Sequence, residues 1–259
     1  MMNLISTTFE NGVGRIKLNR PEKFNSFNRD MALQMQTALD QFSTDAAVRC
    51  IAIEAEGKAF CAGQDLAEAI APDGPGIQKI VDEHYNPIII KIREAQKPVV
   101  AIVQGVAAGA GANIALACDI VLASTSASFI QAFSKIGLIP DSGGTFFLPR
   151  LIGWQRAAAL MMLGDKVGGT EAAQMGMIYK CFDDATLKEE SDKIINQLAT
   201  MPTKGIALTK MLLNKSATND LNQQLKLEEV VQAQAGQTYD HKEGVKAFLE
   251  KRNPVFKGE

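Results

Sequence analysis

The chain has 259 residues, of which 46% are hydrophobic and 22% charged, so it can bury a substantial core and is neither a disordered nor a fibrous protein. Lys and Arg (27) nearly balance Asp and Glu (29), and the formal charge of −2 argues against nucleic acid or an anionic membrane as a partner. Four cysteines without a CxxC pair and two distant histidines predict reduced thiols and no metal. Residues 1–9 resemble no signal or transit peptide, so we expect a cytoplasmic protein.

The first half of the chain alternates short apolar runs with helical patterns. We expect a hairpin at 7–18 around Asn11-Gly12, a helix at 29–41 capped by Asn28, a strand at 49–54, a small-residue loop at 58–66, an exposed Pro/Gly-rich excursion at 71–76, a helix ending near 95, and strands at 99–103 and 120–123. Residues 98–118 carry no charge and are long enough to span a membrane. Their glycines and polar residues instead predict the strand at 99–103 followed, over 105–118, by a glycine-rich turn that enters a helix.

From residue 141 onward the pattern is mostly helical. Helices are expected at 145–151, 154–163, 170–175, 187–198, 205–213 and 221–232, with one strand at 177–181. This order predicts a single mixed α/β domain over residues 1–259, whose C-terminal helices are available for contacts between subunits.

Three glycine-containing turns each follow an expected strand, at 62–66, 105–113 and 137–145. Small residues there let a ligand approach the backbone, and the free N–H groups of a following helix point outward. Two converging turns of this kind make an oxyanion hole, which stabilises a thioester or ester oxygen as it gains negative charge. The alternative is that each turn serves only tight packing. A dinucleotide site is disfavoured because Ile114 occupies the position of the third glycine.

Five segments in order resemble the crotonase family, also called the enoyl-CoA hydratase/isomerase family. They are LNRPEKFNSFN (18–28), FCAGQDL (60–66), PVVAIVQGVAAGAGANIALACDIVLAS (98–124), GLIPDSGGTFFLPR (137–150) and EGVKAFLEKRNPVFKG (243–258). The resemblance implies a ββα spiral core over about 1–200, C-terminal helices over about 201–259, and a trimer or dimer of trimers. It also implies an acyl-CoA thioester as ligand, with no cofactor besides the coenzyme A of the substrate.

The resemblance also assigns site residues. Carried over by position, the oxyanion donors are the backbone N–H groups of Gln64 and Ala110. The neighbouring residues would contact the adenine and pantetheine of coenzyme A, and basic side chains would meet its phosphates, unless those lysines are merely solvated. The first group is Ala62, Gly63, Asp65 and Leu66, and the second is Lys23, Lys251 and Lys257.

The chain departs from the hydratases of the family at two positions. Asn113 and Phe133 stand where two glutamates would add water, so the acid/base pair for hydration is missing. Asn113 is expected either to hydrogen-bond the substrate or to satisfy buried backbone groups, and Phe133 is expected at the substrate or in the core. Asp141 is the remaining carboxylate, and it is either an N-cap of the following helix or an acid/base or nucleophile. A helix N-terminus would lower its pKa, whereas apolar neighbours such as Phe133 and Ile136 would raise it.

Within the family, the segments around Asp141 resemble isomerases that turn the ring 1,2-epoxide of phenylacetyl-CoA, a phenylacetate catabolite, into an oxepin, and whose relatives shift double bonds in enoyl-CoA esters. Some members with an aspartate here are chlorobenzoyl-CoA dehalogenases, but His84 shows no correspondence to their histidine. The sequence therefore predicts an acyl-CoA isomerase. The alternatives are an enoyl-CoA hydratase or acyl-CoA hydrolase, and a non-catalytic CoA-binding scaffold. Phe133, Phe146 and Phe147 are expected either in the acyl pocket or in the core.

Overall fold

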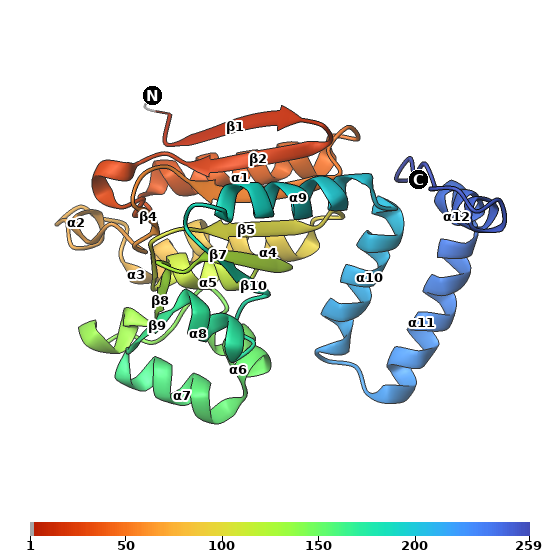
Figure 1. Ribbon diagram of the computed structural model, residues 1–259. Coiled ribbons are helices and arrows are strands. Elements are labelled where there is room, and N and C mark those ends of the chain that lie inside the picture. The colour runs from red at the N-terminus through yellow and green to blue at the C-terminus, as the bar shows by residue number, and fades with distance from the viewer. Residues whose placement is uncertain (1–2) are drawn as a thin grey trace.

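The larger of two β-sheets forms the centre of the computed structural model, which describes residues 3–259 (Figure 1). Met1 and Met2, the start of the predicted domain, lie outside the described residues. The sheet has the order β1-β2-β3-β5-β7-β10, in which the β1–β2 hairpin is antiparallel and all other pairs are parallel. Its strands are β1 (Ile5–Glu10), β2 (Val13–Leu18), β3 (Cys50–Ala55), β5 (Val99–Val103), β7 (Ile120–Ser124) and β10 (Lys180–Phe182).

Side chains of this sheet alternate between two hydrophobic layers, as the period of two along a strand requires. On β3, Ile51 and Ile53 face the layer formed with α1 (Arg29–Thr44) and α4 (Asn86–Glu94). Cys50 and Ala52 face the opposite layer, which α9 (Leu187–Thr200) covers. Because both faces are covered, the central strands are apolar throughout, which is why the sequence showed them as uninterrupted runs.

A second sheet of short strands has the order β4-β6-β8-β9. It contains β4 (Ala59–Cys61), β6 (Val106–Ala108), β8 (Ser128–Ile130) and β9 (Lys166–Gly168). The sequence predicted none of them: it described 58–66 as a loop and 105–118 as a turn and a helix. Each strand has three residues, too few to display an alternating pattern.

Most predicted helices are confirmed within a few residues. Asn28 caps α1, its side chain accepting the backbone N–H of Met31. The helices after the central strands are α5 (Ala110–Leu116), α6 (Gly144–Ile152), α7 (Trp154–Leu163), α8 (Gly169–Gln174), α10 (Thr203–Ser216), α11 (Leu221–Gly236) and α12 (Tyr239–Leu249). Two predictions were wrong in detail: the strand expected at 177–181 is β10 (Lys180–Phe182), and α12 was not predicted as a helix.

The helix expected to end near residue 95 is divided. After the exposed residues of 71–76 come α3 (Ile77–Ile80), one π-helical turn η2 (Val81–Tyr85) and then α4. Pro87, at the start of α4, has no N–H to donate, and it follows the wider π-helical turn directly. This turn brings Tyr85 into the buried interior, where its side chain is 1% exposed.

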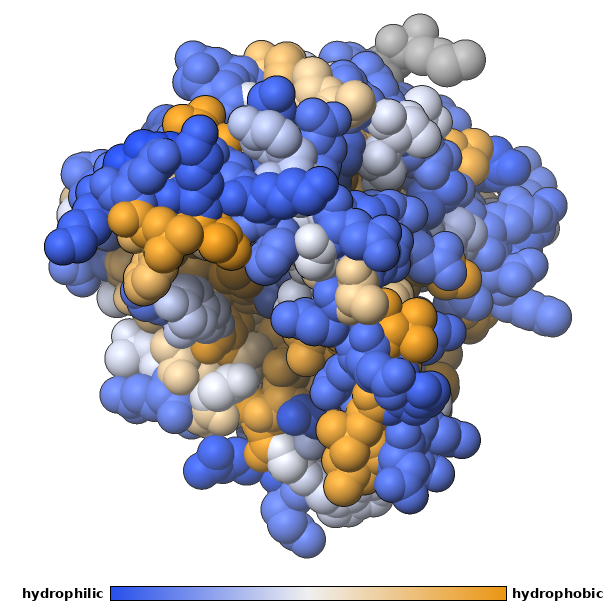
Figure 2. Space-filling view, turned by 90° about the vertical axis from the view of Figure 1, so that its right-hand side faces the viewer, coloured by the Kyte–Doolittle hydropathy of each residue, from blue (hydrophilic) through white to orange (hydrophobic). Residues whose placement is uncertain are grey.

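Helices α10, α11 and α12 form an arm beside the core, on the right of Figure 1. Figure 2 looks onto this side and shows apolar side chains around a hollow. Several large apolar residues of the arm are exposed, among them Leu213, Leu221, Leu225, Val230, Val245, Phe248 and Leu249. Such an exposed apolar surface is typical of a contact between subunits.

Candidate active site

Two glycine turns meet where the second sheet approaches α5. Gly63 has φ +95°, and a Cβ there would lie 3.0 Å from the carbonyl oxygen of Ala108 and 3.6 Å from the backbone nitrogen of Ala110. Gly109, with φ +53° and ψ −127°, turns the chain from β6 into α5. These glycines let the turns at 62–66 and 105–113 touch backbone to backbone, as the sequence predicted for converging turns.

The backbone N–H groups of Gln64 and Ala110 both lie at this contact. Phe27 pairs with Gln64 in a parallel bridge, donating to Gly63 O at 2.7 Å and accepting from Asp65 N at 2.8 Å. This pairing uses the carbonyl oxygen of Gly63 and the N–H of Asp65. The N–H of Gln64, which lies between them, therefore points away from Phe27. Ala110 is the first residue of α5, where a helix has no internal acceptor for its N–H. Within residues 3–259, neither N–H has a hydrogen-bond acceptor.

Asp141 lies in the turn between the 3-10 helix η3 (Ala132–Ile136) and α6. Ser142 Oγ donates to its Oδ1 at 2.8 Å. Burial raises the pKa of the Asp141 carboxyl above 3.8, although the hydrogen bonds from Ser142 and from its own backbone N–H lower it. The alternative role of Asp141, as a cap of the next helix, is wrong: α6 begins at Gly144, its cap is Gly143, and no side chain caps it. Because the net shift of the Asp141 pKa is upward, burial outweighs the hydrogen bonds that lower it.

Asn113, which the resemblance placed at a glutamate position of the hydratases, is 1% exposed and bonded at both ends. Its Nδ2 donates to the carbonyl oxygen of Asp141 at 2.8 Å, and its Oδ1 accepts from Gln131 Nε2 at 2.8 Å. The Asn113 side chain therefore holds the turn of Asp141 in place. A contact between Asn113 and the substrate stays a prediction.

The three phenylalanines differ in their surroundings. Phe133 is 6% exposed, and its ring lies under the Gly109 turn, where a Cβ on Gly109 would be 3.8 Å from Cζ. Phe147 packs against the hydrophobic core. Phe146 is 40% exposed and lies beneath the Arg150 guanidinium, 3.7 Å from its carbon to the ring centre. Phe133 thus lies next to the glycine turn at 105–113.

Tyr85 was missed by the sequence analysis, which considered only its neighbour His84. The Tyr85 hydroxyl donates to Gln64 Oε1 at 2.8 Å. Burial raises its pKa well above 10, and the nearby Cys61, Asp141 and Glu68 act in the same direction. No motif indicates Tyr85; only the break in the helix at the following Asn-Pro could have drawn attention to it.

His84 is completely buried, and neither ring nitrogen has a hydrogen-bond partner among the described residues. Burial lowers its pKa, although Glu68 nearby raises it. His84 is therefore neutral at physiological pH. The charged groups that act on its pKa are Glu68, Arg29, Glu83 and Lys79, and Asp141 is not among them.

The residues expected at coenzyme A surround the start of α2 (Leu66–Ala69). Asp65 caps α2, its side chain accepting the Ala67 N–H, and pairs with Arg20 at 2.7 Å. Burial raises the pKa of Asp65, but the hydrogen bonds from Arg20 and Ala67 outweigh it and hold the pKa below 3.8. Ala62 and Leu66 are exposed, as a ligand-contacting edge requires. Lys23, also exposed, precedes Phe24, whose carbonyl accepts the Ala62 N–H at 3.0 Å.

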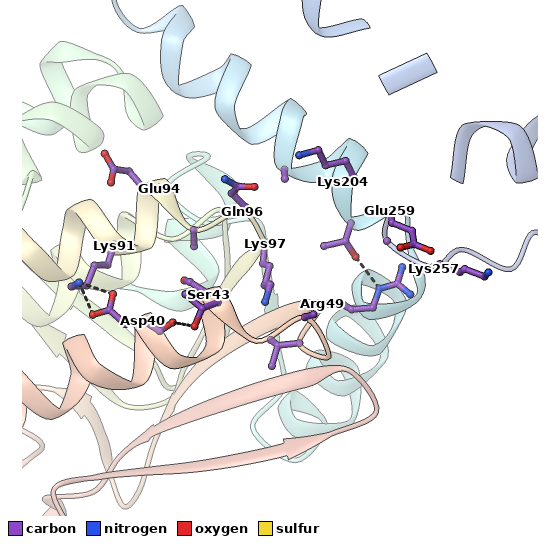
Figure 3. Close-up of a pocket in the computed structure, with 17 residues that line it drawn as sticks. Asp40, Ser43, Arg49, Lys91, Glu94, Gln96, Lys97, Lys204, Lys257 and Glu259 are labelled. Atoms are coloured by element: carbon purple, nitrogen blue, oxygen red, sulfur yellow. Dashed lines mark hydrogen bonds and ion pairs between the residues drawn. The ribbon is translucent and has the colours of Figure 1, made fainter. Parts of the chain in front are cut away.

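Lys251 and Lys257 follow α12, which lies across the molecule from α2 (Figure 1). Within one chain, the structure therefore does not bring them to the oxyanion turns. Lys257 lines a cavity of about 650 Å³ between α1, α4, α10 and the C-terminal tail (residues 250–259) (Figure 3). None of the other predicted site residues lines this cavity.

Among residues 3–259, no group of three or more His, Cys, Asp or Glu side chains could hold a metal ion. None of the helices described is long and apolar enough to cross a membrane.

Comparison with known proteins supports one family. The enoyl-CoA hydratase/isomerase family matches residues 8–259. The 1,2-epoxyphenylacetyl-CoA isomerase of Escherichia coli (strain K12) is 45% identical over 261 residues, covering 100% of both chains. The trans-2-decenoyl-[acyl-carrier-protein] isomerase of Streptococcus mutans is 37% identical and 96% of each chain is covered. The crystal structure of an enoyl-CoA hydratase from Bacillus anthracis superposes with a TM-score of 0.94 at 31% identity, covering 99% of this chain and 100% of that one. The chain belongs to the enoyl-CoA hydratase/isomerase (crotonase) family.

Proposed function

We propose that the protein is an acyl-CoA isomerase that uses Asp141 to move a proton along the acyl group. The observation that carries this proposal is the combination of Asp141, with its raised pKa, and Asn113 and Phe133 in place of the hydratase glutamates. A carboxylate with a raised pKa is a stronger base than an ordinary aspartate, and its carboxyl form keeps the abstracted proton available for transfer to another carbon. The proposed substrates are the ring 1,2-epoxide of phenylacetyl-CoA, as for the Escherichia coli relative, and 3-enoyl-CoA esters.

In the proposed reaction, the thioester oxygen accepts hydrogen bonds from the N–H groups of Gln64 and Ala110. Asp141 removes a proton from the carbon next to the thioester, and the electron pair of that C–H bond moves into the carbonyl to give an enolate. Asp141 then returns the proton to a carbon further along the chain or ring, and the thioester carbonyl re-forms. For the ring epoxide, opening of the carbon–carbon bond under the oxygen gives the seven-membered oxepin. No atom is gained or lost.

The experiment compares the wild type with Asp141→Asn in deuterated water. Each is incubated with the ring-epoxide phenylacetyl-CoA and with a 3-enoyl-CoA, while ultraviolet absorbance and deuterium uptake are followed. We expect the wild type to isomerise both without a change of mass other than deuterium, and Asp141→Asn to be at least about 10³-fold slower. The exposed Asp165→Asn is the matched control and should retain wild-type rates.

Other outcomes would support the alternative functions. Addition of 18 mass units would indicate a hydratase, and release of free coenzyme A would indicate a hydrolase. Binding of acyl-CoA without turnover of either substrate would favour the non-catalytic scaffold. Equal rates for Asp141→Asn and the wild type would remove Asp141 from the mechanism.

The assembly, cofactor and location belong to the same proposal. The exposed apolar residues of α10–α12 support a homotrimer or a dimer of trimers, which sedimentation equilibrium would measure. The proposed reaction neither oxidises nor reduces the substrate, so it needs no cofactor besides the coenzyme A already attached. Cytoplasmic location remains a prediction from the sequence.

A further inference from the structure

The Tyr85 side chain contacts the Gln64 turn and the neighbouring Phe27. Its ring packs on Phe27, with ring centres 6.1 Å apart and planes inclined by 58°. Its hydroxyl reaches the side-chain oxygen of Gln64 at 2.8 Å. Phe27 itself forms the backbone bridge to Gln64, so one aromatic pair contacts both the backbone and the side chain of this residue.

The direction of the Tyr85 hydrogen bond is fixed by its neighbours. Gln64 Nε2 lies 3.1 Å from Glu68 Oε2 and 3.3 Å from the Asp65 carbonyl oxygen. Both of these oxygens are acceptors, so the amide NH₂ must face them and the amide oxygen must face Tyr85. Tyr85 therefore donates its only proton to Gln64.

Glu68, which accepts from Gln64 at the other end of these hydrogen bonds, is itself held by a backbone N–H. Glu68 accepts the backbone N–H of Arg29, the first residue of α1, at 3.0 Å and 3.2 Å through its two oxygens. The bonds from Tyr85 to Gln64 and from Gln64 to Glu68 therefore tie the π-helical turn, the oxyanion turn, α2 and α1 together.

We infer that Tyr85 is a positioning residue, which holds Gln64 so that its backbone N–H points at the thioester oxygen. This inference rests on the proposed function, in which that N–H is an oxyanion donor. Stabilisation of an oxyanion depends on donors held in place before the charge develops. The Phe27 bridge restrains Gln64 on one side of its backbone, and the Tyr85 hydroxyl restrains its side chain.

Loss of the hydroxyl would leave the Gln64 amide oxygen without its donor. The raised pKa of Tyr85 keeps its hydroxyl protonated, so the hydrogen bond to Gln64 is present over the whole working pH range. Phenylalanine preserves the packing on Phe27 and removes only the bond, so Tyr85→Phe isolates the inferred role.

The first test measures turnover of 3-enoyl-CoA. We expect Tyr85→Phe to lower kcat about tenfold and to leave KM within about twofold, because the bond acts on the transition state rather than on binding. Tyr179→Phe is the matched control: this tyrosine is 58% exposed, its ring lies next to Lys180, and its rates should be unchanged. An unchanged kcat in Tyr85→Phe, or an increase in KM alone, would overturn the inference.

A second test does not depend on isomerisation. Cinnamoyl-CoA is an aromatic thioester whose absorbance moves to longer wavelength when its carbonyl is polarised by hydrogen bonds. We expect the shift on binding to be smaller in Tyr85→Phe than in the wild type, with both proteins saturated by the probe. If the wild type isomerised no acyl-CoA at all, the proposed function would fail, and this spectral difference would still decide the role of Tyr85. Equal shifts would reject it.

The third test is a double-mutant cycle with Gln64→Leu, which removes the acceptor of the same bond. If Tyr85 acts through Gln64, the double variant should lose no more of the spectral shift than Gln64→Leu alone. Additive losses would show that Tyr85 acts by another route. Thermal unfolding of each variant checks that both changes leave the protein folded.

Discussion

Asn113 Nδ2 donates to the backbone carbonyl oxygen of Asp141 at 2.8 Å, so a side chain from α5 holds the turn that carries the proposed base. Because α5 also begins with the Ala110 N–H, one helix positions both the proposed base and a proposed oxyanion donor. A Cβ on Gly144 would lie 2.4 Å from Asn113 Nδ2, which shows how tightly this turn is packed against the amide. The Asn113 side chain, which the family resemblance places at a glutamate position of the hydratases, is used here to support the Asp141 turn.

Asn113→Ala should therefore damage both stability and activity. The change leaves the buried Gln131 amide without its acceptor and frees the Asp141 turn, and we expect about 1–3 kcal/mol less stability in urea unfolding. The kcat for 3-enoyl-CoA should fall at least about tenfold, because the carboxylate is no longer held. The exposed Asn196→Ala on α9 is the control, with stability within about 0.5 kcal/mol of the wild type. Wild-type activity in Asn113→Ala would contradict a positioning role.

The raised pKa of Asp141 predicts a gain of stability in Asp141→Asn. Since burial raises the folded-state pKa above 3.8, the fold favours the protonated carboxyl, and this contribution is full below pH 3.8 and is lost as the pH rises through the folded-state pKa. At pH 7 the wild type carries a charge that the fold disfavours, whereas asparagine carries none. Asp141→Asn should therefore melt at a higher temperature at pH 7, and the difference should disappear toward pH 3.5. An equal or lower melting temperature of Asp141→Asn at pH 7 would show that the fold does not disfavour the ionised carboxylate.

Activity has the opposite dependence on pH, because the proposed base must be ionised. In the wild type, kcat/KM for 3-enoyl-CoA should rise with pH and reach a plateau, with a midpoint above 3.8. A midpoint at or below the ordinary value for an aspartate would mean that Asp141 is not the titrating group. The measurement needs only initial rates in a series of buffers at constant ionic strength.

The sequence predicted the parts of this structure that depend on local chemistry. Asn11 and Gly12 predicted the hairpin, and both have positive φ angles. The glycine turns at Gly63 and Gly109 were recognised, because backbone approach needs small residues wherever it occurs. Tyr85 was not, since its importance comes from contacts with Gln64 and Phe27, which lie about twenty and sixty residues away along the chain. Three-residue strands were missed for a related reason: they exist only because a neighbouring strand pairs with them.

Gly63→Ala should disrupt both oxyanion donors. A Cβ at Gly63 would lie 3.0 Å from the Ala108 carbonyl oxygen, and its φ of +95° is unfavourable for any residue with a side chain. The turns must separate to accept it, so we expect kcat to fall about 10²-fold or more, and the absorbance shift of bound cinnamoyl-CoA to be largely lost. Gly205→Ala in α10 is the control, because its Cβ would meet nothing closer than 3.9 Å and alanine favours a helix. A Gly63→Ala enzyme with normal kcat would show that the two turns do not form the oxyanion hole.

Arg49, directly before β3, binds the C-terminal tail to the core (Figure 3). Its guanidinium donates to Thr203 Oγ1 at 2.8 Å, to the Phe256 carbonyl oxygen at 2.8 Å and to the Met201 carbonyl oxygen at 2.6 Å. Arg49→Ala removes all three bonds and leaves two carbonyls to be solvated.

We expect Arg49→Ala to release the tail while the sheet remains folded. Trypsin should cleave at Lys251, Arg252 and Lys257 faster than in the wild type, and far-ultraviolet circular dichroism should be unchanged. Arg156→Ala, an exposed position on α7, is the matched control and should be cleaved at the wild-type rate. If the tail also binds acyl-CoA, as predicted for Lys257, KM should rise in Arg49→Ala with kcat unchanged. Equal cleavage of the two variants would mean that other contacts, such as the bonds from Lys257 N and Gly258 N to the Asp240 carboxylate, suffice to hold the tail.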